Sequence, residues 1–302
     1  MDEPPAARGK ERAAALSVAS NAALITLKVI AGIATGSVSL LTEAAHSGTD
    51  LVAAIGALVS VRKAGEPADS DHPYGHEKIE DLAGATEAAL ILFGAAIITY
   101  ESLARLVHGG HVHTIGWGIA VIGVSAAVNV VVSRVVARSA ARTSSPALAA
   151  DAAHLSADAF SSGAVLIGLT LVAVTGAQWL DPAVALAVAA WIALTGVRIL
   201  MRATRELLDE ALPEEELEGI RAVIRDVGAP RGVVGFHELR ARRAGARRYV
   251  DVHVQFGSGM TLESAHFTAH ELTNAIRTRL PGADVLVHVE PADRVRPGTE
   301  VF

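Results

Sequence analysis

Two short stretches of the chain each place a histidine and an aspartate four residues apart. The first holds His46 and Asp50, and the second holds His154 and Asp158. Because residues i and i+4 lie one turn apart on the same face of an α-helix, each stretch would present an imidazole beside a carboxylate. Two such helices facing each other would supply two nitrogens and two oxygens, a tetrahedral ligand set that suits Zn²⁺.

Both pairs lie within long apolar runs of the sequence. A lone histidine on a soluble helix is more often a core or surface residue than a ligand. In a membrane span the expectation reverses, because ionisable groups are costly in hydrocarbon and usually mark a pathway or a site. The repetition of one pattern in two runs therefore predicts an intramembrane metal site.

Two further groups of residues have the types and spacing of metal ligands. A polar loop carries Asp69, His72 and His76 at chelating spacing, although one short loop supplies only three ligands. The last quarter of the chain is rich in histidine, and two of its candidate ligands lie two apart on an expected strand and so on the same face. A polar sheet surface is the alternative there. These candidates are His237, His253, His266, His288 and Glu290.

The composition indicates a membrane protein. Of the 302 residues, 51% are hydrophobic and only 19% are charged, and the mean hydropathy is +0.39. The absence of cysteine excludes disulfides, thiolate metal sites and cysteine nucleophiles. The formal net charge of -6 argues against a nucleic-acid partner.

Six apolar stretches are long enough to cross a bilayer, which takes roughly 20 residues. Lys and Arg are concentrated before the first stretch, after the second, between the fourth and fifth, and after the sixth, so both termini are expected in the cytoplasm. No removable signal peptide is expected. The six stretches are Ala14–Ala34, Val38–Val61, Leu82–Val107, Ile115–Val136, Ala147–Thr175 and Pro182–Met201.

Three domains are expected: a cytoplasmic N-terminal tail over residues 1–12, a six-helix membrane domain over 13–205, and a cytoplasmic metal-binding domain over 206–302. In the last, the pattern predicts a helix from Pro213 to Val227, strands at 233–243 and 247–256, a helix at 261–280 and a strand at 284–290. This order, αββαβ, is typical of a small α+β domain.

Other polar residues in the spans have two interpretations. Asn21, Lys28, Glu43 and Glu87 could line a pathway, or they could form interhelical hydrogen bonds or extend toward the interface. The second interpretation is favoured for Lys28 and Glu87. A histidine-rich loop is more consistent with a solvated loop than with a site; its histidines are His108, His111 and His113.

Together these features closely resemble the cation diffusion facilitator family, over nearly the whole chain. The resemblance rests on six spans, the paired His-x-x-x-Asp motifs in the second and fifth, the Asp69-x-x-His72-x-x-x-His76 loop and the histidine-bearing C-terminal domain. It implies a homodimer in the inner or plasma membrane that exports divalent metal from the cytoplasm in exchange for protons, by alternating access, and it implies no enzymatic activity.

The resemblance also implies roles for individual residues. His46, Asp50, His154 and Asp158 match the transport site, and Asp69, His72 and His76 match a loop site found in some bacterial members. The C-terminal candidates match a pair of bound ions, with His266 reaching across from the partner subunit. Glu290 stands where relatives often carry Asp, and Lys78 and Asp209 match a charge pair between the two domains.

The ligand types predict the metal. Two His and two Asp suit Zn²⁺ as the substrate, and Zn²⁺ is also the expected bound regulatory or structural ion. The same ligands could accept Fe²⁺ or Co²⁺, whereas Mn²⁺, a harder ion, and Cd²⁺ are expected to fit less well. Two other classes are an intramembrane metallohydrolase and a membrane-bound metal sensor or scaffold. The hydrolase is disfavoured because no His-Glu-x-x-His motif occurs and four protein ligands leave little room for water.

Overall fold

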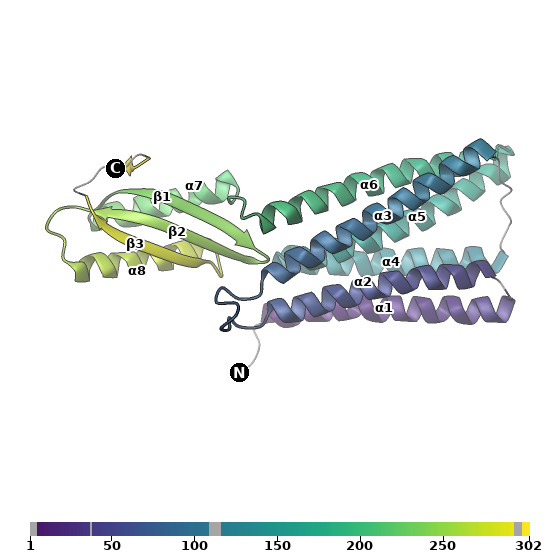
Figure 1. Cartoon of the computed structure of the whole chain (residues 1–302), viewed down its shortest axis with the longest axis horizontal. Coiled ribbons are helices and arrows are strands. Elements are labelled where there is room, and N and C mark those ends of the chain that lie inside the picture. Colours follow the sequence, from purple (N-terminus) through teal and green to yellow (C-terminus); the bar gives the residue numbers. More distant parts are fainter. Residues whose placement is uncertain (1–4, 37, 109–115, 293–297) are drawn as a thin grey trace. The chain divides into compact units, whose positions relative to one another are not determined.

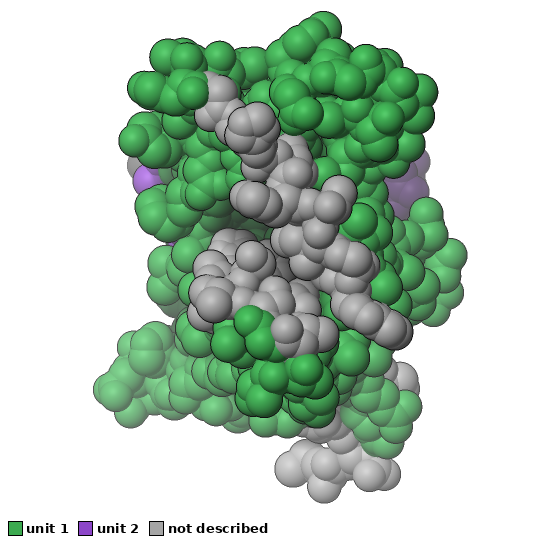
Figure 2. All heavy atoms as spheres, turned by 90° about the vertical axis from the view of Figure 1, so that its right-hand side faces the viewer, with its two compact units in different colours: residues 1–204 green, residues 205–302 purple. Residues whose placement is uncertain are grey.

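A computed structural model describes residues 5–36, 38–108, 116–292 and 298–302 (Figure 1). Within these ranges the side chains of residues 5–7, 35, 38–40, 42, 43, 45, 46 and 116–118 are outside the description. By its internal contacts the chain divides into two compact units, Met1–Thr204 and Arg205–Phe302. Figure 2 shows these two units in different colours.

Six long helices form the first unit (Figure 1). Among the residues that the structure describes, five of these helices, all but the second, contain a segment long and apolar enough to cross a membrane. The helices are α1 (Pro5–Thr35), α2 (Val38–Ala64), α3 (Lys78–His108), α4 (Gly116–Thr143), α5 (Pro146–Thr175) and α6 (Leu180–Leu207).

Helix α1 begins at Pro5 rather than at the expected Ala14, so residues 5–12 are helical. Two ion pairs hold this charged segment against other helices of the unit. Lys10 Nζ lies 2.7 Å from Glu80 Oε1 on α3, and Arg62 on α2 pairs with Glu11. The hydropathy pattern missed these turns because their partners are charged side chains and not apolar ones.

The start of α5 is fixed by its own sequence and by its neighbours. Ser145 is the N-cap, its Oγ accepts the N–H of Leu148, and Pro146 opens the first turn, where a missing N–H costs nothing. Ser145 Oγ also donates to Glu80 on α3. Gly84 on α3 packs so close to this end that an added Cβ would lie 3.4 Å from the carbonyl oxygen of Pro146. Helices α3 and α5 are therefore closely packed beside the point where Lys10 of α1 also binds.

The second unit is the expected αββαβ arrangement with one addition. The strands form one sheet in the order β3-β2-β1-β4, in which β1 and β2 are antiparallel and β3 runs parallel to β2. The short β4 at the C-terminal end, which pairs with β1, was not expected. The elements are α7 (Glu214–Val223), a π-helical turn (Ile224–Gly228), a 3-10 turn (Ala229–Arg231), β1 (Val233–Ala244), β2 (Arg247–Phe256), α8 (Leu262–Arg279), β3 (Asp284–Pro291) and β4 (Glu300–Val301).

One face of this sheet carries the core of the unit. Val250, Val252 and Val254 of β2 are buried against side chains of both helices, among them Ile220 of α7 and Leu272 of α8. Because side chains alternate along a strand, the residues between these valines point to the opposite face. The core therefore dictates which face of the sheet carries His253.

Candidate metal sites

The first candidate site joins α2 and α5 in the helical unit. His154 Nε2 donates a hydrogen bond to Asp50 Oδ1 at 3.3 Å and lies 3.9 Å from Asp158 Oδ2. Ligand atoms of the three residues all lie within 4.8 Å of one another. We call Asp50, His154 and Asp158 the membrane cluster. The fourth expected ligand, His46, lies on α2, but its side chain is outside the described part, so its place in the site stays a prediction.

The membrane cluster contains one buried and two half-buried residues, and it has spare coordinating capacity. Asp50 is 8% exposed, and the second ring nitrogen of His154, Nδ1, is buried with no hydrogen-bond partner among the described residues. Two carboxylates would neutralise the charge of one divalent cation, and an imidazole nitrogen would complete three sides of a tetrahedron. The cluster is therefore suited to binding a divalent metal ion.

Two more buried carboxylates lie beside the membrane cluster. Asp151 is three residues before His154 on α5, is 2% exposed, and accepts a hydrogen bond from Ser17 of α1 at 2.9 Å. Glu87 of α3 is 3% exposed, and neither of its carboxylate oxygens has a hydrogen-bond partner among the described residues. Glu87 interacts electrostatically with Asp151, His154 and Asp158.

The expectation of an interhelical hydrogen bond was thus wrong for Glu87. It holds for Lys28, whose ammonium on α1 donates to Ser47 Oγ on α2 at 2.6 Å. The sequence analysis did not single out Asp151. Its position one helical turn before His154, on the same face, is the signal that could have identified it.

The second candidate site is the loop between α2 and α3. Asp69 Oδ2 lies 3.2 Å from His76 Nε2, and Asp69 Oδ1 lies 3.3 Å from His72 Nδ1. Ligand atoms of all three lie within 4.8 Å of one another. The backbone N–H of His72 donates to Asp69 at 2.7 Å and, with that of Asp71, lowers the pKa of this carboxyl group. The three expected ligands therefore converge around an ionised carboxylate.

The third candidate site lies on the face of the sheet opposite the core. His237, His253 and His288 stand in register on β1, β2 and β3, so they form a row across three strands. The ring centroids of neighbouring members are 5.0 and 4.6 Å apart. Glu290 accepts hydrogen bonds from His237 Nε2 and His253 Nδ1, both at 2.9 Å, and lies 3.5 Å from His288 Nε2. Four of the five expected ligands therefore lie together, with the three histidines around the carboxylate of Glu290.

Glu238 joins this group, although the sequence analysis missed it. Its Oε2 lies 3.5 Å from His253 Nε2, and ligand atoms of His237, Glu238 and His253 lie within 4.8 Å of one another. In a regular strand Glu238 and His237 would point to opposite faces. No local pattern of residue types indicates that they share one. We call His237, Glu238, His253, His288 and Glu290 the sheet cluster.

The fifth expected ligand, His266, does not join the sheet cluster within the described chain. It is exposed on α8, where its Nε2 lies 3.2 Å from that of His270, one turn away. Its proposed approach from a partner subunit stays a prediction. Asp209 accepts a hydrogen bond from Arg242 at 2.7 Å within the second unit, and its pairing with Lys78 also stays a prediction.

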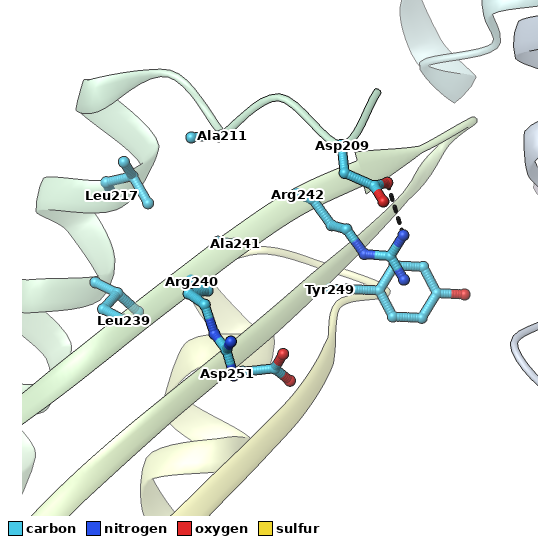
Figure 3. A pocket seen from close by; sticks show the side chains of 9 residues that line it. All are labelled: Asp209, Ala211, Leu217, Leu239, Arg240, Ala241, Arg242, Tyr249 and Asp251. Atoms are coloured by element: carbon cyan, nitrogen blue, oxygen red, sulfur yellow. Dashed lines mark hydrogen bonds and ion pairs between the residues drawn. The ribbon is translucent and has the colours of Figure 1, made fainter. Parts of the chain in front are cut away.

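A separate cavity of about 450 Å³ lies in the second unit (Figure 3). Arg242 lies over the Tyr249 ring, with its guanidinium carbon 5.0 Å from the ring centroid. The lining contains no histidine, so this cavity is distinct from the sheet cluster. Its lining residues are Asp209, Ala211, Leu217, Leu239, Arg240, Ala241, Arg242, Tyr249 and Asp251.

Comparison with known proteins agrees with this division of the chain. Residues 14–208 match the family model of the cation efflux transmembrane domain, and residues 212–292 match that of the cation efflux protein cytoplasmic domain. The Cation-efflux pump FieF of Serratia proteamaculans is 35% identical over 301 residues, covering 99% of this chain and 98% of that protein.

Two other proteins have sequences similar to this chain or to part of it. An uncharacterized transporter of Synechocystis sp. is 34% identical over 283 residues, covering 93% of this chain and 90% of that protein. A solved structure of the putative zinc transporter CzrB in its zinc form is 37% identical, covering 29% of this chain and 99% of that chain, with a TM-score of 0.27. The matches to both family models and to full-length relatives establish that the chain belongs to the cation efflux family of multi-pass membrane transporters.

Proposed function

We propose that this protein exports divalent metal ions from the cytoplasm, with Zn²⁺ as the principal substrate, in exchange for protons. The observation that carries the proposal is the convergence of Asp50, His154 and Asp158 from two helices of the membrane unit. Two carboxylates and an imidazole suit Zn²⁺, and His46 would complete a tetrahedral set. Fe²⁺ and Co²⁺ fit the same ligands and are the alternative substrates, ahead of Mn²⁺ and Cd²⁺.

Proton exchange follows from the chemistry of these ligands. A histidine must lose its proton before it can bind a metal ion, so metal and protons compete for the same nitrogen. Histidine is also the side chain whose ordinary pKa lies nearest to physiological pH. An alternating-access cycle could therefore release metal on one side of the membrane by protonating His154.

We place both termini and the second unit in the cytoplasm of a homodimer in the cell membrane. The distribution of Lys and Arg in the loops supports the orientation. The match of residues 212–292 to a cytoplasmic domain of cation efflux proteins supports the location of the second unit. In this arrangement the loop site of Asp69, His72 and His76 would lie on the side from which metal is taken up, and so would the sheet cluster.

Flux into proteoliposomes under an imposed pH gradient tests the proposal. We expect Zn²⁺ uptake that depends on the gradient, with weaker uptake of Co²⁺ and Fe²⁺ and least of Mn²⁺ and Cd²⁺. Proton movement in the opposite direction, reported by a pH-sensitive dye inside the vesicles, should accompany uptake. Metal flux that ignores the pH gradient would refute the exchange, and the absence of flux for all five ions would favour a membrane-bound sensor or scaffold.

A further inference from the structure

The backbone of β1 is irregular at the point where it enters the sheet cluster. The register with β2 shifts between His237 and Arg240, which marks a β-bulge. Glu238 lies in this bulge with φ of 50°, in the left-handed region that non-glycine residues seldom occupy. Such a conformation is strained and persists only where the surrounding structure enforces it.

The bulge has one consequence for the side chains. It brings His237 and Glu238, which are consecutive, to within ligand distance of the same histidine, His253. A regular strand would place only one of them on this face of the sheet. Bulges of this kind re-aim a side chain next to a functional site. Glu238, the residue with the strained backbone, is therefore also the residue whose carboxylate the bulge turns toward His253.

The two nitrogens of His253 each face a different carboxylate. Nδ1 lies 2.9 Å from Glu290 Oε1, and Nε2 lies 3.5 Å from Glu238 Oε2. A neutral imidazole carries one N–H and one lone pair. When Nδ1–H donates to Glu290, the lone pair is on Nε2 and points toward Glu238. A carboxylate on the far nitrogen commonly orients a metal-binding histidine in this way.

We propose that the sheet cluster has two metal positions and that Glu238 is a ligand of the first, together with His253 Nε2 and His237. Glu290 orients His253 and is the carboxylate ligand of the second position, beside His288. Each position then has its own carboxylate. Two divalent ions close together repel each other strongly, and a second negative ligand reduces that repulsion. Glu238 is about half exposed, so its carboxylate can turn toward an ion without disturbing the core.

The test uses the full chain in detergent, carrying Asp158→Asn and His72→Ala so that the sheet cluster dominates metal binding. Zn²⁺ affinity is measured by calorimetry, and the visible absorption of bound Co²⁺ reports the ligand set. Glu238→Gln keeps the shape of the side chain but is a much poorer ligand. We expect at least about a 10-fold loss of affinity at one of the two positions and a changed Co²⁺ spectrum. Glu215→Gln, at an exposed position on α7, is the matched control and should change neither.

Glu238→Gly separates the ligand from the backbone strain. Glycine adopts a φ of 50° without penalty, so the metal-free variant should melt at the same temperature as the parent or higher. Its Zn²⁺ affinity should nevertheless fall as in Glu238→Gln, a combination that a purely structural role would not produce. Parental Zn²⁺ affinity and an unchanged Co²⁺ spectrum in both variants would overturn the proposal. Flux in proteoliposomes remains a separate measurement, so failure here would leave the proposed transport untouched.

Discussion

The two aspartates of the membrane cluster are its two carboxylate ligands in the proposed site. Asp50 comes from α2 and Asp158 from α5, and His154 lies between them. Replacing either by Asn keeps its volume but leaves a divalent ion with one negative ligand in a site of low dielectric, where charge imbalance is expensive. We expect Asp50→Asn and Asp158→Asn each to reduce Zn²⁺ flux at least about 100-fold while the protein stays folded.

Flux in proteoliposomes, with size-exclusion profiles to verify folding, measures this effect. Glu101→Gln, an exposed position on the same membrane unit, serves as the control for losing a carboxylate and should transport normally. Near-normal Zn²⁺ flux in both Asp variants would show that the ion passes elsewhere in the protein.

His46 is where the choice of metal should be most sensitive. A carboxylate is a harder ligand than an imidazole and tolerates more coordination geometries, so His46→Asp should broaden transport toward Cd²⁺ or Mn²⁺. Competition of these ions with Zn²⁺ in the flux assay gives the measurement. An unchanged metal profile would place selectivity in other residues, and Glu87 and Asp151 are then the next carboxylates to vary.

Residue types and spacing predicted which candidate ligands lie close together wherever regular geometry relates the residues. The i, i+4 rule pairs His154 with Asp158, and strand alternation pairs His288 with Glu290. The same rules could not predict Glu238, because its side chain reaches the cluster only through a bulge at a non-glycine position. Nor could they predict Glu87, whose closeness to the membrane cluster depends on how α3 packs against α5.

Among the elements, α7 is linked to two strands of the sheet by the carboxylate of Glu216, in addition to its apolar packing. Glu216 accepts hydrogen bonds from Arg243 on β1 at 2.8 Å and from Arg248 on β2 at 2.6 Å. Partial burial opposes ionisation, but the contacts with Arg248 and Arg243 outweigh it and lower the pKa of Glu216. A lowered pKa in the folded state stabilises the fold above the pKa of the unfolded chain, and the stabilisation disappears as pH falls through the folded value.

Glu216→Gln should therefore reduce the free energy of unfolding of the second unit by about 0.5–1 kcal/mol at pH 7, a figure already discounted for solvent screening. As the pH falls below the ordinary pKa of Glu and through the lowered pKa of folded Glu216, the carboxylate becomes protonated and the difference from the parent should shrink. Urea unfolding of residues 205–302 at pH 7 and pH 3.5, followed by circular dichroism, gives both values. A difference that is the same at the two pH values would mean that packing of Glu216, and not its charge, is responsible.

The elements also show the limits of hydropathy as a guide to boundaries. The extra turns of α1 before Ala14 are held by ion pairs to Glu80 and Arg62, so no apolar periodicity marks them. Strand β4 contains only Glu300 and Val301, which is too short for an alternating pattern, and it forms by pairing with β1. By contrast, the hairpin of β1 and β2 follows directly from alternation on both sides of Gly245.

At the scale of the whole molecule, the second unit has its own hydrophobic core and so a folding equilibrium of its own. Its candidate metal ligands lie on three strands and converge only when the sheet is formed. A metal ion that binds the folded sheet and not the unfolded chain must stabilise it by mass action. If the site also uses His266 from a partner subunit, the same ion will strengthen the dimer.

We therefore expect residues 206–302 to melt higher, or to dimerise more tightly, when Zn²⁺ is added. His288→Ala should remove most of that response, because the ligand atoms of His288, Glu290 and His253 lie within 4.8 Å of one another. Differential scanning calorimetry and sedimentation measure the two effects, and the full chain carrying His288→Ala should keep Zn²⁺ binding at the membrane cluster. If the second unit binds Zn²⁺ no better than an exposed histidine pair does, the expected stabilisation by Zn²⁺ is contradicted, whereas the proposed metal export is unaffected.

The row of histidines across β1, β2 and β3 has a consequence for how the second unit folds. His237, His253 and His288 face one another only in the native pairing of the strands. If β2 or β3 slipped by one residue, its histidine would turn to the core face and a valine would take its place outside. Such a misaligned sheet could not bind the ion. A bound zinc ion would then favour the native register of the strands, because only correctly paired chains could bind it and be stabilised by it.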